Sequence, residues 1–167
     1  DFQDTISTLK NIFQGSSVEI AAKKAIEENS SLKKQIEELI REKAARIKDK
    51  LVEQAIEIEG IRVVSTVMPA SAALVKDITF GIRAEYPKST IIVIGSHENG
   101  KPMITVSVSD DLTSRFNAGQ MVREAAKLIQ GGGGGQPHFA TAGGKNSEGL
   151  HAAVEAVKET VAVTPAS

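Results

Sequence analysis

The start of the chain alternates apolar and polar residues with a helical period. Apolar residues recur every three or four positions over residues 4–14, at Ile6, Leu9, Ile12 and Phe13. This spacing predicts a short amphipathic helix that ends at Gly15. Ser16 and Glu19 then have the spacing of a capping box. Because neither Pro nor Gly follows for more than forty residues, a second helix is predicted from Ser16 to about Glu59.

This long predicted helix carries one narrow apolar stripe. Its best-spaced members are Ile36, Ile40, Ala44, Ile47 and Leu51, with Leu32 and Leu39 beside them and Ala55 and Ile58 beyond. Spacings of four, four and three do not repeat as a regular heptad, so a regular left-handed coiled coil is not expected. The stripe must pack either on the domain that follows or on another helix, through helix packing or dimerisation. The Asn-Ser-Ser run at residues 29–31 is a predicted position for a bend or break.

After Gly60 the pattern changes to β-branched runs. Residues 61–67 predict a strand, and Pro69 suits the first turn of the helix that follows. Apolar residues at helical spacing over residues 74–82 give that helix a buried face. The continuous apolar run at residues 90–95 is typical of a strand that is buried on both faces of a sheet.

A hairpin is expected next, because Asn99-Gly100 is a strong tight-turn signal. Residues 103–108 alternate as the returning strand. The chain is therefore predicted to form a small α/β (α+β) domain with a mixed three- to four-stranded sheet flanked by helices. We place this globular domain at residues 60–167 and a helical arm at residues 1–59.

Two further helices are predicted in the last third of the chain. Asn117 can cap the first of these helices. The apolar side of that helix consists of Val122, Ala125, Ala126 and Ile129. Ser147 can cap the last helix, which would pack through Leu150, Val154 and Val157. The tail, residues 164–167, is expected to fray.

Between these helices, residues 131–144 spell G-G-G-G-G-Q-P-H-F-A-T-A-G-G. Five consecutive glycines are a poor way to end a helix, because one suffices for a C-cap. One interpretation is a flexible surface loop. The other is a loop whose exposed N–H groups meet a phosphate-bearing ligand. Arg123, Lys127, His138 and Lys145 lie on or near this segment, which gives modest support to an anionic partner.

Composition limits the alternatives. The 167 residues have a formal net charge of -1, so a nucleic-acid surface would have to be local. Without Cys there can be no disulfide and no thiolate metal site, which fits a cytoplasmic protein. No signal peptide is visible, and no apolar run approaches the ~20 residues that cross a bilayer, so no membrane partner is expected. The start at Asp1, without Met, suggests a fragment of a longer chain.

Familiar catalytic and nucleotide motifs fail to match. At Gly144-Lys145 a Walker loop would need Ser or Thr next, but Asn146 follows, and Phe139 holds the first glycine position. A dinucleotide fingerprint needs a strand before the glycines, whereas a helix is predicted there, and Gln136 replaces the last glycine.

Metal and acid–base sites are not predicted either. The three histidines at positions 97, 138 and 151 have no metal-ligand spacing. Neither a nucleophile elbow nor a clear carboxylate pair is present. We therefore expect no catalytic centre and no metal site in this chain.

The pattern G-G-G-G-G-x-P-x-x-A-x-A-G-G followed by Lys145 resembles the C-terminal signature of alanyl-tRNA synthetases. The domain before it is similar to the DHH-associated C-terminal domain of DHH-family phosphoesterases, and the helical arm also resembles that of the synthetases. The resemblance covers nearly all of the chain. It implies a fragment without a catalytic centre, from an enzyme that attaches alanine to tRNA(Ala) with ATP.

The resemblance also implies partners and site residues. The module would bind the tRNA elbow, bridge the aminoacylation and editing domains of the rest of the synthetase, and support a homodimer through its helical part. ATP, Mg and Zn would belong to the missing domains. The implied tRNA-binding residues are Gly131, Gly132, Gly133, Gly134, Gly135, Pro137, Ala140, Ala142, Gly143, Gly144 and Lys145. Arg123 and Lys127 join them from the charge pattern, whereas Gln136 and His138 occupy variable positions.

Two alternatives stay open. The chain could be the substrate-binding domain of a DHH-family phosphoesterase that acts on short nucleotides, although no DHH motif occurs in it. It could instead be a purely structural dimer module built on the apolar stripe.

Overall fold

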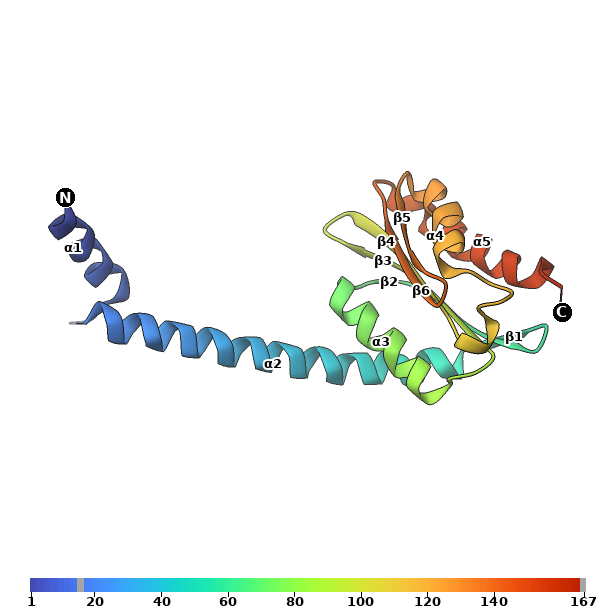
Figure 1. Ribbon diagram of the computed structural model, residues 1–167, viewed down its shortest axis with the longest axis horizontal. Coiled ribbons are helices and arrows are strands. Elements are labelled where there is room, and N and C mark those ends of the chain that lie inside the picture. The colour runs from blue at the N-terminus through green and yellow to red at the C-terminus, as the bar shows by residue number, and fades with distance from the viewer. Residues whose placement is uncertain (15–16, 166–167) are drawn as a thin grey trace. The chain divides into compact units, whose positions relative to one another are not determined.

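The computed structural model describes residues 1–14 and 17–165, and the chain forms two compact units, Asp1–Leu39 and Ile40–Ser167. Helix α1 (Phe2–Phe13) belongs to the first unit, and helix α2 (Val18–Glu53) begins in the first and ends in the second (Figure 1). α2 continues through residues 29–31, so the predicted bend or break there is wrong. The predicted helix stop at Gly15 and the cap at Ser16 lie outside the described residues.

The predicted extension of the long helix to Glu59 is wrong, because Ile56–Ile58 forms strand β1, antiparallel to β2 (Ile61–Pro69). Glu59 and Gly60 connect the two strands with φ angles of 50° and 77°. Two consecutive residues in this left-handed region are the signature of a two-residue hairpin turn. An I-E-I alternation before Glu-Gly therefore marks a strand, although the absence of Gly and Pro upstream suggested a helix.

Helix α3 (Ala72–Glu85) connects β2 to β3 (Thr90–Glu98), and these two strands are parallel. Ser71 caps α3, because its hydroxyl accepts a hydrogen bond from the Leu74 amide. Pro69, predicted in the first helical turn, is instead the last residue of β2.

Strand β4 (Lys101–Val108) returns antiparallel to β3, as the Asn99-Gly100 signal predicted. Asn99 and Gly100 have φ angles of 51° and 74°. The sheet is thus mixed, as predicted. It has six strands in the order β1-β2-β3-β4-β6-β5, so the predicted three to four strands are too few.

The C-terminal part contains α4 (Ala118–Ala126), β5 (Gly132–Gln136), β6 (Phe139–Gly143) and α5 (Leu150–Val163), with short 3-10 turns at Asp110–Leu112, Lys127–Ile129 and Ser147–Gly149. Asn117 caps α4 as predicted, by accepting a hydrogen bond from the Gln120 amide. Ser147 begins a 3-10 turn that is capped by Asn146, and α5 follows at Leu150.

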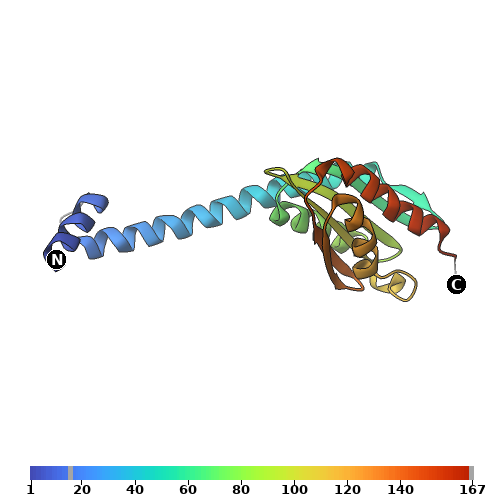
Figure 2. The same cartoon turned by 90° about the horizontal axis from the view of Figure 1, so that it is seen from above.

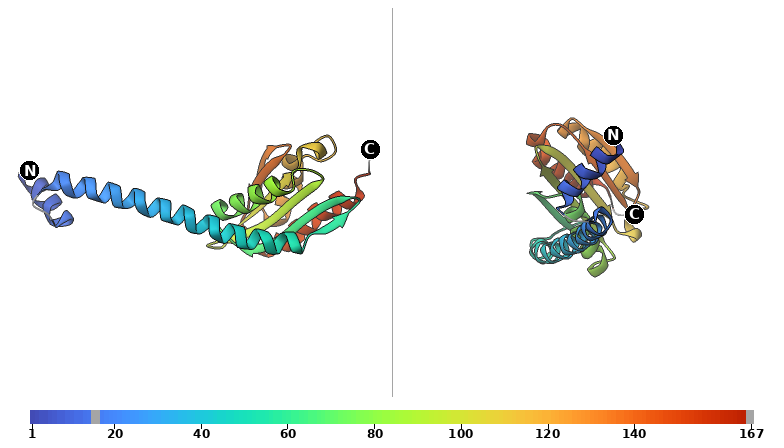
Figure 3. Two further views of the ribbon diagram at one scale, coloured as in Figure 1. Left: turned by 90° about the horizontal axis from the view of Figure 1, so that it is seen from below. Right: turned by 90° about the vertical axis from the view of Figure 1, so that its left-hand side faces the viewer.

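Two apolar cores sandwich the sheet of the second unit. On one face, α4 and α5 pack against β2, β3, β4 and β6 (Figure 2). On the other face lie α3 and the end of α2 (Figure 3, left). Ala44 and Leu51 are buried in this second core, and Ile40 and Ile47 pack against it.

The apolar stripe of α2 is therefore buried in its C-terminal half and exposed further towards the N-terminus. Its C-terminal half packs on its own globular unit, which was one of the two predicted alternatives, whereas Ile36 is 55% exposed. Contacts group residues 40–59 with the globular unit, although the sequence placed the domain division after residue 59.

Candidate nucleic-acid interface

The glycine-rich segment is a β-hairpin at the edge of the sheet. β5 pairs antiparallel with β6, from Gly132 opposite Gly143 to Gln136 opposite Phe139, and β6 pairs with β4. The expected irregular loop is therefore wrong. The segment A-T-A decides the structure, because Ala140 and Ala142 alternate with half-buried neighbours and are almost fully buried. These two alanines pack in the core, so the expectation that they contact a ligand is also wrong.

Alternate glycines of the hairpin are required by the protein's own packing. A Cβ on Gly131, Gly133 or Gly135 would overlap backbone atoms of β6 or of the residue that follows it. A Cβ on Gly144 would overlap the carbonyl group of Ile129. These four glycines allow two stretches of main chain to approach closely, and this packing role needs no ligand.

Gly132 and Gly143 differ from these packing glycines. A Cβ on Gly132 would meet nothing within 4 Å, and a Cβ on Gly143 would meet only the Pro102 carbonyl oxygen, at 3.9 Å. Neither has a positive φ. Glycine in a strand costs roughly 0.5–1 kcal/mol relative to alanine. Packing among the described residues therefore gives no reason for glycine at these two paired positions.

The hairpin turn and the last glycine are fastened to neighbouring helices. The Ala118 amide at the start of α4 donates to the Pro137 carbonyl oxygen at 2.9 Å. Beyond β6, the amides of Lys145 and Asn146 both donate to the Ile129 carbonyl oxygen, at 2.8 and 2.9 Å. Pro137 and the Lys145 backbone thus hold the hairpin in place, while the Lys145 side chain remains exposed.

Basic side chains lie beside the glycine hairpin. On α4, the Arg123 Nε lies 3.6 Å from where a Cβ on Gly134 would stand, so its guanidinium group lies beside the glycine strand. Lys127 is engaged by Glu124, with 2.6 Å between the ammonium and a carboxylate oxygen. For the residues that the structure describes, no ion pair of Arg123 or Lys145 is found. Of the three predicted cations Arg123, Lys127 and Lys145, only Lys127 has an ion-pair partner among the described residues, and that pair is exposed.

Residues 63–163 match the family model of the DHHA1 domain. The chain belongs to this DHHA1 domain family. An alanine–tRNA ligase of Bacteroides thetaiotaomicron is 52% identical over 163 residues, which is 96% of this chain but 19% of that protein. The alanine–tRNA ligase of Porphyromonas gingivalis is 43% identical over 158 residues, covering 93% of this chain and 18% of that protein. The DHHA1 chain thus spans about a fifth of the length of the curated relatives that it matches.

Solved structures confirm the fold. The C-Ala domain of alanyl-tRNA synthetase from Aquifex aeolicus superposes with a TM-score of 0.59 at 24% identity, covering 65% of this chain and 97% of that chain. A DHH domain described as a member of a family of ribosomal proteins has a TM-score of 0.53 at 18% identity, covering 75% of this chain and 31% of that chain. At these identities the two matches show a shared fold.

Arg83, which the sequence reasoning missed, ties the hairpin turn of the DHHA1 domain to the sheet. From α3, its guanidinium donates to the Ser107 hydroxyl and to the Val108 and His138 carbonyl oxygens, at 3.0 to 3.1 Å. It also forms an ion pair with Asp110 at 3.0 Å. The available signal was an arginine within the small and apolar stretch F-G-I-R-A, where a cation needs internal partners.

Aromatic stacking at the hairpin is internal. The Phe139 ring lies 5.4 Å from that of Phe80 on α3, at an interplanar angle of 35°. Phe139, the nearest aromatic residue to the glycines, therefore has a partner within the DHHA1 domain.

Among the residues that the structure describes, no three His, Cys, Asp or Glu side chains form a group that could hold a metal ion. None of the described helices has the length and apolar character needed to cross a bilayer.

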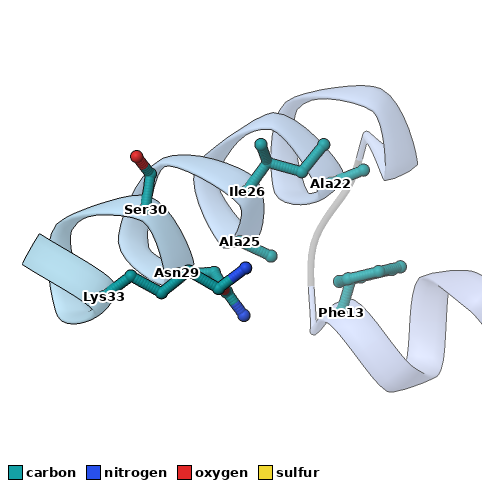
Figure 4. Close-up of a pocket in the computed structure, with 7 residues that line it drawn as sticks. All are labelled: Phe13, Ala22, Ala25, Ile26, Asn29, Ser30 and Lys33. Atoms are coloured by element: carbon teal, nitrogen blue, oxygen red, sulfur yellow. The ribbon is translucent and has the colours of Figure 1, made fainter. Parts of the chain in front are cut away.

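A cavity of about 680 Å³ in the first unit lies between Phe13 of α1 and one side of α2 (Figure 4). Asn29, Ser30 and Lys33 provide its polar groups, and it holds no carboxylate for acid–base chemistry.

Proposed function

We propose that this DHHA1 domain binds the elbow of tRNA(Ala) as the C-terminal part of an alanyl-tRNA synthetase, and that it bridges the aminoacylation and editing domains of that enzyme. Its similarity to alanine–tRNA ligases over nearly its whole length supports the assignment. On this proposal, the attachment of alanine with ATP occurs elsewhere in the enzyme, in the cytoplasm. The ATP, Mg²⁺ and zinc of the enzyme belong, on the same proposal, to those other domains.

The observation that carries the proposal is the pair Gly132 and Gly143. Both are exposed, both have room for a side chain, and both lack one. Main chain without side chains on the outer hairpin of the sheet lets a bulky partner approach closely, and unpaired backbone N–H groups of an edge strand such as β5 can bond phosphate oxygens. Glycine at these two positions therefore leaves room for a partner molecule to contact the backbone.

RNA is a suitable partner for such a surface. Folded RNA is recognised largely by shape, through phosphates and 2′-hydroxyl groups, and this mode needs few cations. Arg123 and Lys145 place two positive charges beside the hairpin in a chain whose formal net charge is -1. The proposed interface is thus a local electropositive edge built around the glycine hairpin.

Fluorescence anisotropy with labelled tRNA(Ala) tests the proposal. Binding by the wild type should weaken linearly with the logarithm of salt concentration. Gly132→Asp and Arg123→Ala should each weaken binding several-fold, because one adds a side chain and a negative charge and the other removes a cation. Gln54→Glu is the matched control: it adds one negative charge at an exposed position next to β1, the opposite edge of the sheet. Equal affinities for all four proteins would refute the proposal.

The same assay tests the alternative of a phosphoesterase substrate domain. Tight binding of short dinucleotides, with no binding of tRNA, would favour that alternative. The likeness to a DHH domain at 18% identity supports the fold alone, so tRNA binding is the function we propose.

For the first unit we propose contact with a second copy of the chain. Leu32, Ile36 and Leu39, at spacings of four and three, are 57%, 55% and 64% exposed. An exposed apolar seam of this kind favours association with another helix. Light scattering should return a dimer for the wild type and a monomer for Ile36→Asp. A wild type that stays monomeric at high concentration would refute the dimer.

A further inference from the structure

A cavity of about 340 Å³ opens beside the glycine hairpin, on the face of the sheet that carries α3. The first turn of α3, the tip of the β3–β4 hairpin and the end of β6 form its walls. Ala72, Ser96, Lys101, Met103, Thr141 and Gly143 are among its lining residues. Its volume lies at the lower end of the range for small-ligand sites.

The inner wall of this cavity contains a buried hydroxyl group without a partner. Ser96 is 1% exposed, and no described residue forms a hydrogen bond with its Oγ. A buried hydroxyl without a partner is costly, and native proteins satisfy such groups in most cases. Ser96 therefore places an unsatisfied hydroxyl group in the cavity wall, just beneath its accessible surface.

The position of the cavity links it to the proposed interface. Gly143 lines it, and Gly143 is the cross-strand partner of Gly132. A polynucleotide that lies against these two glycines passes the mouth of the cavity. This step rests on the proposed function, since it takes the bound polymer to be RNA.

The lining favours a nucleobase over a phosphate group. Ala72, Pro102 and Met103 provide apolar surfaces of the kind that the faces of a base need. Ser96 and Thr141 provide hydroxyl groups for its polar edge. A phosphate would lose hydration against the apolar side chains, and the lining charges Glu98 and Lys101 are one of each sign, so they give the cavity no net positive charge to compensate for that loss.

We propose that this cavity receives a single unstacked nucleobase of the RNA that lies on the glycine hairpin. Unstacked bases in loops are the usual targets of RNA recognition, because their polar edges are free to form hydrogen bonds. The Ser96 hydroxyl then gains in the complex the partner that it lacks in the free protein.

Two adjacent substitutions test the proposal with the full chain and labelled tRNA(Ala). Ala72→Leu places a larger side chain in the cavity wall, whereas Ala73→Leu adds the same side chain at the next position, which is also exposed but does not line the cavity. We expect Ala72→Leu to weaken tRNA binding at least tenfold and Ala73→Leu to leave it unchanged. Thermal unfolding monitored by circular dichroism verifies that both variants fold.

Ser96→Ala gives a second and independent readout. Because it removes a buried hydroxyl that has no partner, it should keep or raise the melting temperature while it weakens tRNA binding. A loss of stability together with unchanged affinity would show a structural role for Ser96 and would overturn the proposal.

The outcomes separate the two proposals. If the wild type binds tRNA and Gly132→Asp weakens it, but Ala72→Leu and Ala73→Leu bind equally, the nucleobase site is wrong and the interface stands. If the wild type does not bind tRNA, both are wrong. If free nucleosides perturb the amide NMR signals of Ser96 and Thr141 and inorganic phosphate does not, the base is supported as the ligand group. The reverse pattern overturns it.

Discussion

Gly133, which has no room for a Cβ, and Gly132, which has room, should respond differently to substitution by alanine when the free energy of unfolding is measured. Ala at position 132 adds a methyl group that meets nothing within 4 Å. Because it also reduces the freedom of the unfolded chain, Gly132→Ala should stabilise the domain by ~0.4–1 kcal/mol. At position 133 the same methyl group would overlap the Thr141 carbonyl oxygen and Ala142. Forced displacement of this kind costs about 1–3 kcal/mol or more.

The two variants should therefore differ by about 1.5–4 kcal/mol, which for a chain of this size is a difference in melting temperature on the order of 3–16 °C. Urea denaturation followed by circular dichroism measures the free energy of unfolding, and anisotropy with tRNA(Ala) measures binding on the same samples. Gly132→Leu extends the series: it should fold like the wild type and bind tRNA more weakly. Equal stability of the two alanine variants would refute the packing division, and wild-type affinity of Gly132→Leu would refute the role of bare main chain.

Three further predictions concern the scaffold. Arg83→Met should destabilise the domain by about 2–4 kcal/mol in urea denaturation, because it removes the guanidinium hydrogen bonds to Ser107, Val108 and His138 and the ion pair with Asp110. A loss below about 0.5 kcal/mol would contradict this role. Burial raises the pKa of Asp111, but hydrogen bonds from Ser109 and Ser89 lower it more, so the pKa lies below its ordinary value of 3.8. Because the pKa of Asp111 is lower in the folded state, its carboxylate stabilises the fold at pH values above its pKa in the unfolded chain. This stabilisation is lost as the pH falls through the pKa of the folded state. Asp111→Asn should therefore flatten the loss of stability below about pH 4, and an unchanged pH profile would argue against this role of Asp111. Leu51→Asp should unfold the globular unit, because Leu51 is buried, whereas Ile36→Asp should leave the melting temperature of that unit unchanged, because Ile36 is exposed. Similar losses of melting temperature in the two variants would show that both parts of the stripe pack on the globular unit.

Local patterns predicted the centre of the sheet well. The β-branched run at residues 61–67, the helical spacing at residues 74–82 and the Asn99-Gly100 turn each depend on neighbours in sequence, and each formed as predicted. The errors have local causes as well. Pro69 can end a strand as well as begin a helix, and the short I-E-I run of β1 is too brief for its period of two to outweigh the helical stretch before it.

The glycine segment shows where sequence reasoning reaches its limit. Glycine has no side chain, so a run of five contains no alternation that could predict a strand. The residues A-T-A did alternate, but a strand of glycines gains its stability from the partner strand and from α4, both of which are tertiary contacts. Which glycines serve packing and which leave a surface open depends on distances to Thr141, Gly143 and Ile129.

The amino-acid sequence by itself determined the element types where side-chain periodicity was present, the absence of disulfides, and the resemblance on which the family assignment rests. Tertiary structure alone decided which surface covers the stripe of α2, which alanines are hidden, and that Ser96 lies in a cavity wall beside Gly143. The physical reason is that periodicity records only that a face is apolar. The surface that comes to lie against that face is set by the packing of residues far apart in the chain.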